Sequence, residues 1–171
     1  MRTDIRAARS VAPHVKTPRS RRPLALRSLI ALLVFQGVTA LGGGLALIAE
    51  PNGALVGIKL SVLQNTPVGS FLIPGLLLAI PLGLVPLLIA RDIAQNWRHS
   101  WATRVEQLIG VSVGWAGSLA VGIGLIVWIV VEYLMIDYHW LQAVMGVVGV
   151  AITALTLLPS IRRRFTIVRI R

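Results

Sequence analysis

The hydrophobic positions of this chain are gathered into four stretches that contain no charged side chain, at residues 29–49, 71–90, 108–131 and 141–161. Each has about 20 residues or more, and at roughly 1.5 Å of rise per residue a helix of that length crosses a hydrocarbon core of roughly 30 Å. Backbone polar groups within lipid must be satisfied inside their own segment, which favours helices. The pattern therefore predicts an all-α fold, a bundle of four transmembrane helices within residues 23–161.

The composition agrees with lipid as the solvent of this protein. Hydrophobic residues make up 56% of the chain and charged residues only 13%, with a mean hydropathy of +0.79. A soluble domain carries about a quarter of its residues as charged side chains. The first span could also be a cleavable signal peptide, but its apolar run exceeds the usual length of about 7–15 residues. We expect it to be retained.

The basic residues predict how the chain crosses the membrane. Sixteen of the 17 Lys and Arg side chains precede the first span, follow the fourth or lie between the second and third, and Lys59 alone lies in another connection. Since short loops rich in Lys and Arg remain in the cytoplasm, both termini are expected to be cytoplasmic. The predicted location is the cell membrane, with four crossings.

The net charge of +11 has a different meaning here than in a soluble protein. The predicted cytoplasmic segments hold sixteen basic and three acidic residues, while the predicted outer segments hold one basic and three acidic residues. Membrane insertion accounts for this asymmetry, so we expect no nucleic-acid partner. The chain contains no cysteine, which excludes disulfides and thiol catalysis.

Both ends of the chain are basic and polar. Residues 1–22 contain Pro, Arg and Ser with little hydrophobic periodicity, which predicts a disordered cytoplasmic arm, and residues 162–171 are expected to form a basic cytoplasmic tail. Basic side chains beside the spans act either as topology signals only or also attract anionic lipid headgroups. The candidates for lipid contact are Arg19, Arg21, Arg22, Arg162, Arg163 and Arg164.

Four polar residues form the only candidate site. Glu50 and Glu132 are predicted at the outer ends of the first and third helices, and Asp137 and His139 follow in the next outer connection. A carboxylate buried in a membrane marks a functional position because its burial is costly, whereas one at headgroup depth is simply solvated. If both glutamates point inward, the four residues would form a small acidic mouth.

No recognised catalytic or metal-binding pattern accompanies these residues. The sequence lacks an HExxH motif, a GxSxG nucleophile elbow and any pair of neighbouring histidines. The run 42–44 of three glycines has neither the preceding strand nor the following Lys-Ser/Thr of a phosphate loop. We therefore expect no metal, no cofactor and no enzymatic activity.

Small residues in the third span predict close helix packing. Gly110, Gly114, Ser118 and Gly122 lie four residues apart on one helical face, and small residues allow the close backbone approach that associates helices in lipid. Replacing Gly114 with Leu is expected to disrupt assembly of the bundle. The second span instead contains Pro74, Pro81 and Pro86, and kinks are predicted near the last two.

The connection at residues 50–70 begins with Glu50-Pro51-Asn52-Gly53, a turn sequence. The following positions fit a short helix on the membrane surface and a short strand equally well. The sequence does not decide between this helix and this strand.

Two parts of the sequence resemble a known group. The first part contains Phe35-Gln36-Gly37 through Gly42-Gly43-Gly44, then Glu50-Pro51-Asn52-Gly53, and ends with Phe71-Leu72-Ile73-Pro74-Gly75. The second part runs from Trp128-Ile129-Val130-Val131-Glu132 to Trp140-Leu141-Gln142. Together they resemble uncharacterised small four-helix membrane proteins of bacteria, especially actinobacteria, over roughly residues 29–160. The resemblance implies the four-span architecture and carries no activity.

These observations favour a non-enzymatic membrane protein that acts through helix–helix or partner contacts, either with another membrane protein or as a homo-oligomer. The alternative is a small transporter or channel that uses Glu132 or Glu50 near the outer face. A membrane enzyme acting on lipid or quinone lacks the paired acid and base that it would need.

Overall fold

The computed structural model describes residues 24–64, 67–95, 112–135 and 139–165, and every regular element within these ranges is helical. Four helical segments are long and apolar enough to cross a membrane. The first is α1 (Leu24–Ala49), and the second runs from Leu72 to Gln95. The third lies in α5 (Val113–Met135) and the fourth is α6 (Trp140–Leu157). The prediction of an all-helical fold with four candidate membrane spans is confirmed.

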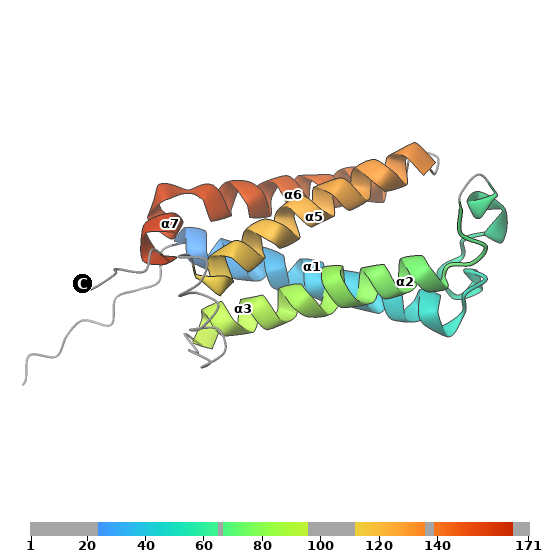
Figure 1. The fold of residues 1–171 in the computed structure, drawn as a ribbon, viewed down its shortest axis with the longest axis horizontal. Coiled ribbons are helices and arrows are strands. Elements are labelled where there is room, and N and C mark those ends of the chain that lie inside the picture. The colour runs from blue at the N-terminus through green and yellow to red at the C-terminus, as the bar shows by residue number, and fades with distance from the viewer. Residues whose placement is uncertain (1–23, 65–66, 96–111, 136–138, 166–171) are drawn as a thin grey trace, which may run out of the picture.

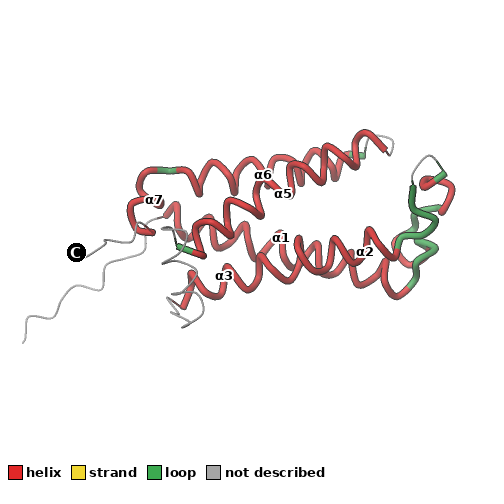
Figure 2. The backbone as a smooth tube through the Cα atoms, viewed as in Figure 1, coloured by secondary structure: helices red, strands yellow, loops and turns green. Residues whose placement is uncertain are grey.

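The four segments form two hairpins that lie against each other (Figure 1). In the first hairpin α1 packs along the second segment, and in the second hairpin α5 packs along α6. Contacts of α1 with α6 and of α3 (Val85–Gln95) with α5 join the two hairpins. Their backbones separate towards the end of the molecule that carries the start of the second segment (Figure 2).

We name the two ends of the bundle by their residues. The basic end holds the starts of α1 and α5 and the ends of α3 and α6, and the described arginines Arg27, Arg91, Arg162 and Arg163 belong to α1, α3 and α7. The loop end holds the connection between α1 and the second segment, together with the last turn of α5 and the first turn of α6 (Figure 1).

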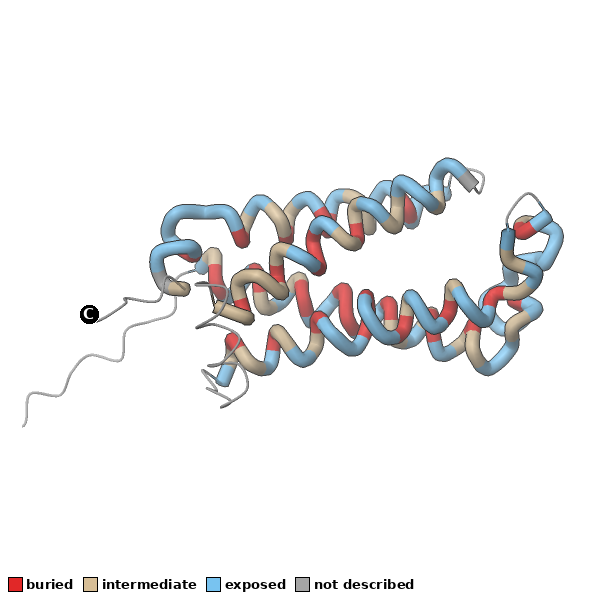
Figure 3. Tube along the Cα trace, viewed as in Figure 1, coloured by how far each residue is buried: buried red, intermediate tan, exposed pale blue. Residues whose placement is uncertain are grey.

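The main core lies where the two hairpins meet (Figure 3). Leu29, Leu33, Leu125 and Ile152 belong to it and are almost completely buried. A separate small core at the loop end consists of Leu47, Leu63 and Phe71. Many large apolar side chains remain exposed, as expected of helices whose outer faces contact lipid.

The second segment contains an irregular stretch at its prolines. It consists of α2 (Leu72–Ala79), the π-helical turn η3 (Ile80–Leu84) and α3. The Val85 N–H donates to the carbonyl of Ile80, five residues earlier. Local unwinding near Pro81 and Pro86 therefore takes the form of a π-turn, which inserts one extra residue into a helix.

The observed helix ends differ from the predicted ones. α1 begins at Leu24, five residues before its uncharged stretch, because Arg27 and Ser28 are tolerated on an exposed surface of the first turns. α5 continues through Met135, whereas the predicted span ended at residue 131. Charge sets the edges of an apolar stretch, but a helix continues through polar residues that remain at a boundary.

The fourth span ends earlier than predicted. α6 stops at Leu157, and Leu158 adopts an extended conformation with ψ 133° because the next residue is Pro159. A separate short helix, α7 (Pro159–Phe165), then follows. Arg162 and Arg163, the first residues of the predicted basic tail, belong to this helix. Residues 1–22 and 166–171 of the predicted arm and tail lie outside the described residues.

The connection at the loop end contains two short 3₁₀ helices, η1 (Ala54–Val56) and η2 (Leu60–Leu63). Of the two predicted alternatives, a short helix and a strand, the described residues contain the helical one, as two short 3₁₀ helices instead of a single short helix. Gly53 has φ 82°, and a side chain there would meet the carbonyl of Ile58 and the ring of Phe71. The Phe71 N–H donates to the Pro51 carbonyl at 2.8 Å, which closes the connection onto its own helices.

Candidate functional site

Three of the four residues of the predicted acidic mouth lie in the described structure, on elements of both hairpins. Glu132 lies half-buried in the last turn of α5, and His139 is exposed at the residue before α6. Glu50 is exposed just after α1, on the other hairpin. Asp137 lies outside the described residues. Glu132 and His139 are close enough to interact electrostatically.

His139 caps the start of α6. Its Nδ1 accepts a hydrogen bond from the Leu141 N–H at 3.4 Å, and its own N–H donates to Oε1 of Gln142 at 3.1 Å. This reciprocal pair is a capping box with His in the usual place of Ser or Thr. Since Nδ1 is an acceptor, a neutral His139 carries its proton on Nε2. The side chain therefore has a structural role at this helix end.

Gln142 is a residue that the sequence interpretation missed. It is 5% exposed and joins the cap of α6 to the interface between α5 and α6. The signal that could have identified it is the presence of Gln three residues after a polar N-cap, followed by an apolar run.

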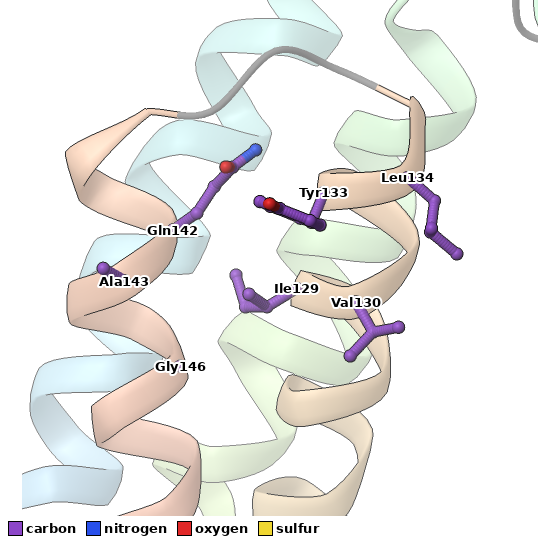
Figure 4. A pocket seen from close by; sticks show the side chains of 7 residues that line it. All are labelled: Ile129, Val130, Tyr133, Leu134, Gln142, Ala143 and Gly146. Atoms are coloured by element: carbon purple, nitrogen blue, oxygen red, sulfur yellow. The ribbon is translucent and has the colours of Figure 1, made fainter.

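An apolar groove of about 270 Å³ opens between α5 and α6 at the loop end (Figure 4). Tyr133 from α5 and Gln142 from α6 lie on opposite sides of it in this view. Hydrocarbon side chains form nearly all of its surface, so it fits a hydrocarbon chain better than a polar substrate. The residues that line it are Ile129, Val130, Tyr133, Leu134, Gln142, Ala143 and Gly146.

The predicted small-residue face of the third span divides between different neighbours. At Gly122, a Cβ atom would meet Oγ1 of Thr153 and would lie 3.0 Å from the Thr153 nitrogen, so α6 is in close contact there. At Gly114, a Cβ would lie 3.3 Å from Cγ1 of Ile93 in α3 and 3.5 Å from the ring of Phe165 in α7. Ser118 is completely buried and donates to the Gly114 carbonyl at 2.7 Å. Gly110 lies outside the described residues.

Among the glycines within helices, those between α1 and the second segment lie closest to the backbone of a facing helix. A Cβ on Gly44 would lie 2.5 Å from the Ala79 nitrogen and 2.7 Å from the Gly75 carbonyl oxygen. One on Gly83 would lie 2.8 Å from the Leu41 nitrogen, and one on Gly37 would lie 2.9 Å from the Gly83 carbonyl oxygen. These two helices approach so closely that no side chain fits between them at these positions.

The π-turn aligns these glycines. Gly37 and Gly44 are seven residues apart, close to two turns of an α-helix, whereas Gly75 and Gly83 are eight apart. The extra residue inserted by η3 lets eight residues span the same two turns, so that Gly75 and Gly83 both face α1.

A buried amide accompanies the π-turn. Gln36 in α1 is 1% exposed, and its Nε2 donates to the carbonyl of Leu82 at 3.4 Å. That carbonyl lies four residues before Pro86, which has no N–H to offer it. Gln36 therefore supplies a donor that Pro86 cannot, while its own Oε1 is buried without a hydrogen-bond partner in the described structure.

The remaining chemistry of the described residues is sparse. Within those ranges no three His, Cys, Asp or Glu side chains gather in a way that could hold a metal ion. At the basic end Arg27, Arg162 and Arg163 are exposed. Of the other candidate lipid contacts, Arg19, Arg21 and Arg22 lie outside the described residues, and the side chain of Arg164 is not described.

Comparison with protein-family models, with curated proteins and with solved structures gave no match to this chain. The resemblance to small four-helix bacterial membrane proteins therefore stays a prediction.

Proposed function

We propose that this protein is a multi-pass protein of the cell membrane that acts without catalysis, through contacts of its helices with a membrane-protein partner or with a second copy of itself. One observation carries the proposal. The buried polar side chains of the described bundle engage the backbone of the bundle instead of facing a shared polar cavity. These residues are Gln36, Ser118, Gln142 and Thr156.

The outward face of α5 supports contact with a further helix. Ala116, Ala120 and Gly124 lie four residues apart, and Ala120 is exposed. A Cβ on Gly124 would have no atom within 4 Å. Small residues allow a second helix to approach closely in lipid, so this face is the proposed contact.

Co-purification in mild detergent tests the proposal. The intact chain is expected to retain a specific membrane-protein partner or a second copy, identified by mass spectrometry and by mass in detergent. Ala120→Leu should abolish this association without lowering the thermal stability of the isolated bundle. Val147→Leu, on the exposed surface of α6 and away from the proposed contact, serves as the control. Association that survives Ala120→Leu would contradict the proposed contact.

The proposed orientation places both termini and the basic end in the cytoplasm, supported by the distribution of Lys and Arg. The absence of cysteine allows a direct test with single introduced cysteines. Lys59→Cys is expected to react with an impermeant maleimide in intact cells, and Arg171→Cys only after permeabilisation. The opposite result would reverse the orientation.

A second candidate function rests on Glu132, since a half-buried carboxylate within a membrane-spanning helix marks a possible ion or proton site. A transporter or channel of this kind should support ion flux in proteoliposomes, and Glu132→Gln should abolish that flux while Glu50→Gln, on the exposed residue, leaves it unchanged. Equal flux in the wild type and in Glu132→Gln would exclude this role for Glu132.

A further inference from the structure

The position of α7 follows from the length of α6. Eighteen residues of α6 rise about 27 Å at roughly 1.5 Å each, close to the hydrocarbon thickness of roughly 30 Å. With Trp140 at one boundary, the turn at Leu158–Pro159 reaches the other boundary. α7 therefore starts at headgroup depth and lies at the basic end of the bundle (Figure 1).

The helix is fixed to the bundle through one face. Ile161 is completely buried and belongs to the same cluster as Leu26 and Leu29 at the start of α1. Phe165, four residues later and so on the same face of α7, packs against that cluster. Its ring also lies beside Gly114 of α5. α7 is therefore held against the bundle and is not an extension of a tail.

The opposite face carries charge. Arg162 and Arg163 lie between Ile161 and Phe165 in sequence, and both are exposed. The seven residues of α7 include no acidic side chain, and none occurs in the first turns of α1, where Arg27 is also exposed. A helix with an apolar face buried and a basic face at headgroup depth is typical of a segment that lies in the membrane interface.

We infer that α7 presents Arg162 and Arg163 as a binding site for the headgroups of anionic phospholipids, with Arg27 contributing from α1. The guanidinium group matches the planar oxygen pairs of a phosphate, which favours paired hydrogen bonds over simple charge attraction. This inference deepens the proposed function by naming a lipid partner, and it rests on the proposed placement in the membrane.

The test measures lipid retention by the full chain in detergent. The protein is incubated with equal amounts of phosphatidylglycerol and phosphatidylcholine, and bound lipid is counted by native mass spectrometry. The wild type is expected to prefer phosphatidylglycerol. Arg162→Gln with Arg163→Gln should lower that preference about 25-fold, since each basic residue near an anionic surface contributes roughly fivefold.

A matched control separates a built site from total charge. Arg169→Gln with Arg171→Gln removes the same charge from the end of the chain, and the preference is expected to remain within about threefold of the wild type. An equal loss in both double variants would overturn the inference, as would an unchanged preference in Arg162→Gln with Arg163→Gln.

A further variant tests the support of the helix. Ile161→Ala keeps every charge but removes the buried anchor, and we expect a loss of preference of at least about fivefold, comparable to the loss of one arginine. If Ile161→Ala does not fold, Arg162→Lys with Arg163→Lys replaces it. That variant keeps the charge but lacks the paired donors, and it should lose part of the preference. If whichever of these two variants folds retains the full preference for phosphatidylglycerol, the inference is overturned.

Soluble glycerol 3-phosphate distinguishes a lipid headgroup from free phosphate. It is expected not to displace bound phosphatidylglycerol, and displacement at equal concentration would assign the site to free phosphate and overturn the lipid assignment. The proposed location in the membrane is tested separately by washing membranes at alkaline pH. Release of the protein by this wash would contradict the membrane location itself.

Discussion

The two hairpins reach close packing by different means. Between α1 and the second segment, four glycines bring the two backbones together across a π-turn, and the Gln36 amide donates to the Leu82 carbonyl. Between α5 and α6, the helices are regular, and the contact is made by Gly122 and Gly149. There the hydroxyl groups of Thr153 and Thr156 donate to carbonyls within their own helix.

This comparison shows that the neighbour of a glycine matters more than its spacing along the helix. At Gly44 and Gly83 in the first hairpin, the nearest atoms are backbone atoms of the facing helix, which cannot move without separating the helices. In the second hairpin the nearest atom to Gly122 is a side-chain hydroxyl. Gly42 and Gly124 face no atom within 4 Å, although they lie in the same helices.

The largest effect is expected from Gly44→Ala. The added Cβ would lie 2.5 Å from the Ala79 nitrogen, so the two backbones must separate, and overpacking of this kind destabilises by about 3 kcal/mol. Unfolding titrated with SDS, or thermal unfolding in detergent, measures the change. Gly42→Ala is the matched control and should leave the stability unchanged or raise it slightly. Equal stabilities of the two variants would refute the close backbone contact.

A smaller effect is expected from Gly122→Ala, about 2 kcal/mol in the same measurement. The new Cβ would meet the hydroxyl of Thr153, so adding Thr153→Ala should restore part of the lost stability. If Thr153→Ala restores nothing, then the backbone at Thr153, and not its hydroxyl, prevents a side chain at position 122.

Gly114→Ala is expected to lower stability by less than about 1 kcal/mol, since the Ile93 side chain at 3.3 Å can move.

The smallest effect concerns the amide at the π-turn. Gln36→Leu removes the hydrogen bond to the Leu82 carbonyl, and an interhelical hydrogen bond in lipid contributes about 0.6 kcal/mol on average. Pro86→Ala gives the helix an N–H for that carbonyl, so Gln36→Leu should have less effect in this background. A double-mutant cycle measures the difference, and strictly additive effects would show that Gln36 does not compensate for Pro86.

The sequence predicted the helices better than it predicted their ends. Long uncharged stretches identify spans because burying a charge in lipid is costly, and this rule does not depend on neighbouring helices. It does not indicate where a helix continues at the boundary, as α5 does through Glu132 to Met135. The signal for the end of α6 was present in Pro159, which disfavours helical geometry at the residue before it.

The candidate site was harder to predict. Glu132 and His139 are near neighbours because α5 and α6 form the second hairpin. Glu50 follows α1 in the first hairpin, and the two hairpins separate at the loop end. Sequence position placed all of these residues at one membrane boundary but could not place them around it. The choice of neighbours depends on packing between helices.

The sequence by itself determined that the chain forms four apolar helices and that its basic residues gather in three of the five segments outside them, because both depend on the free energy of placing single residues in lipid or water. Only the tertiary structure decided which glycines are in close contact and that α7 packs back onto the bundle through Ile161. It also decided that the π-turn makes Gly75 and Gly83, eight residues apart, both face α1. These features arise from contacts between segments distant in sequence. In lipid, close packing and not hydrophobicity determines which helices associate.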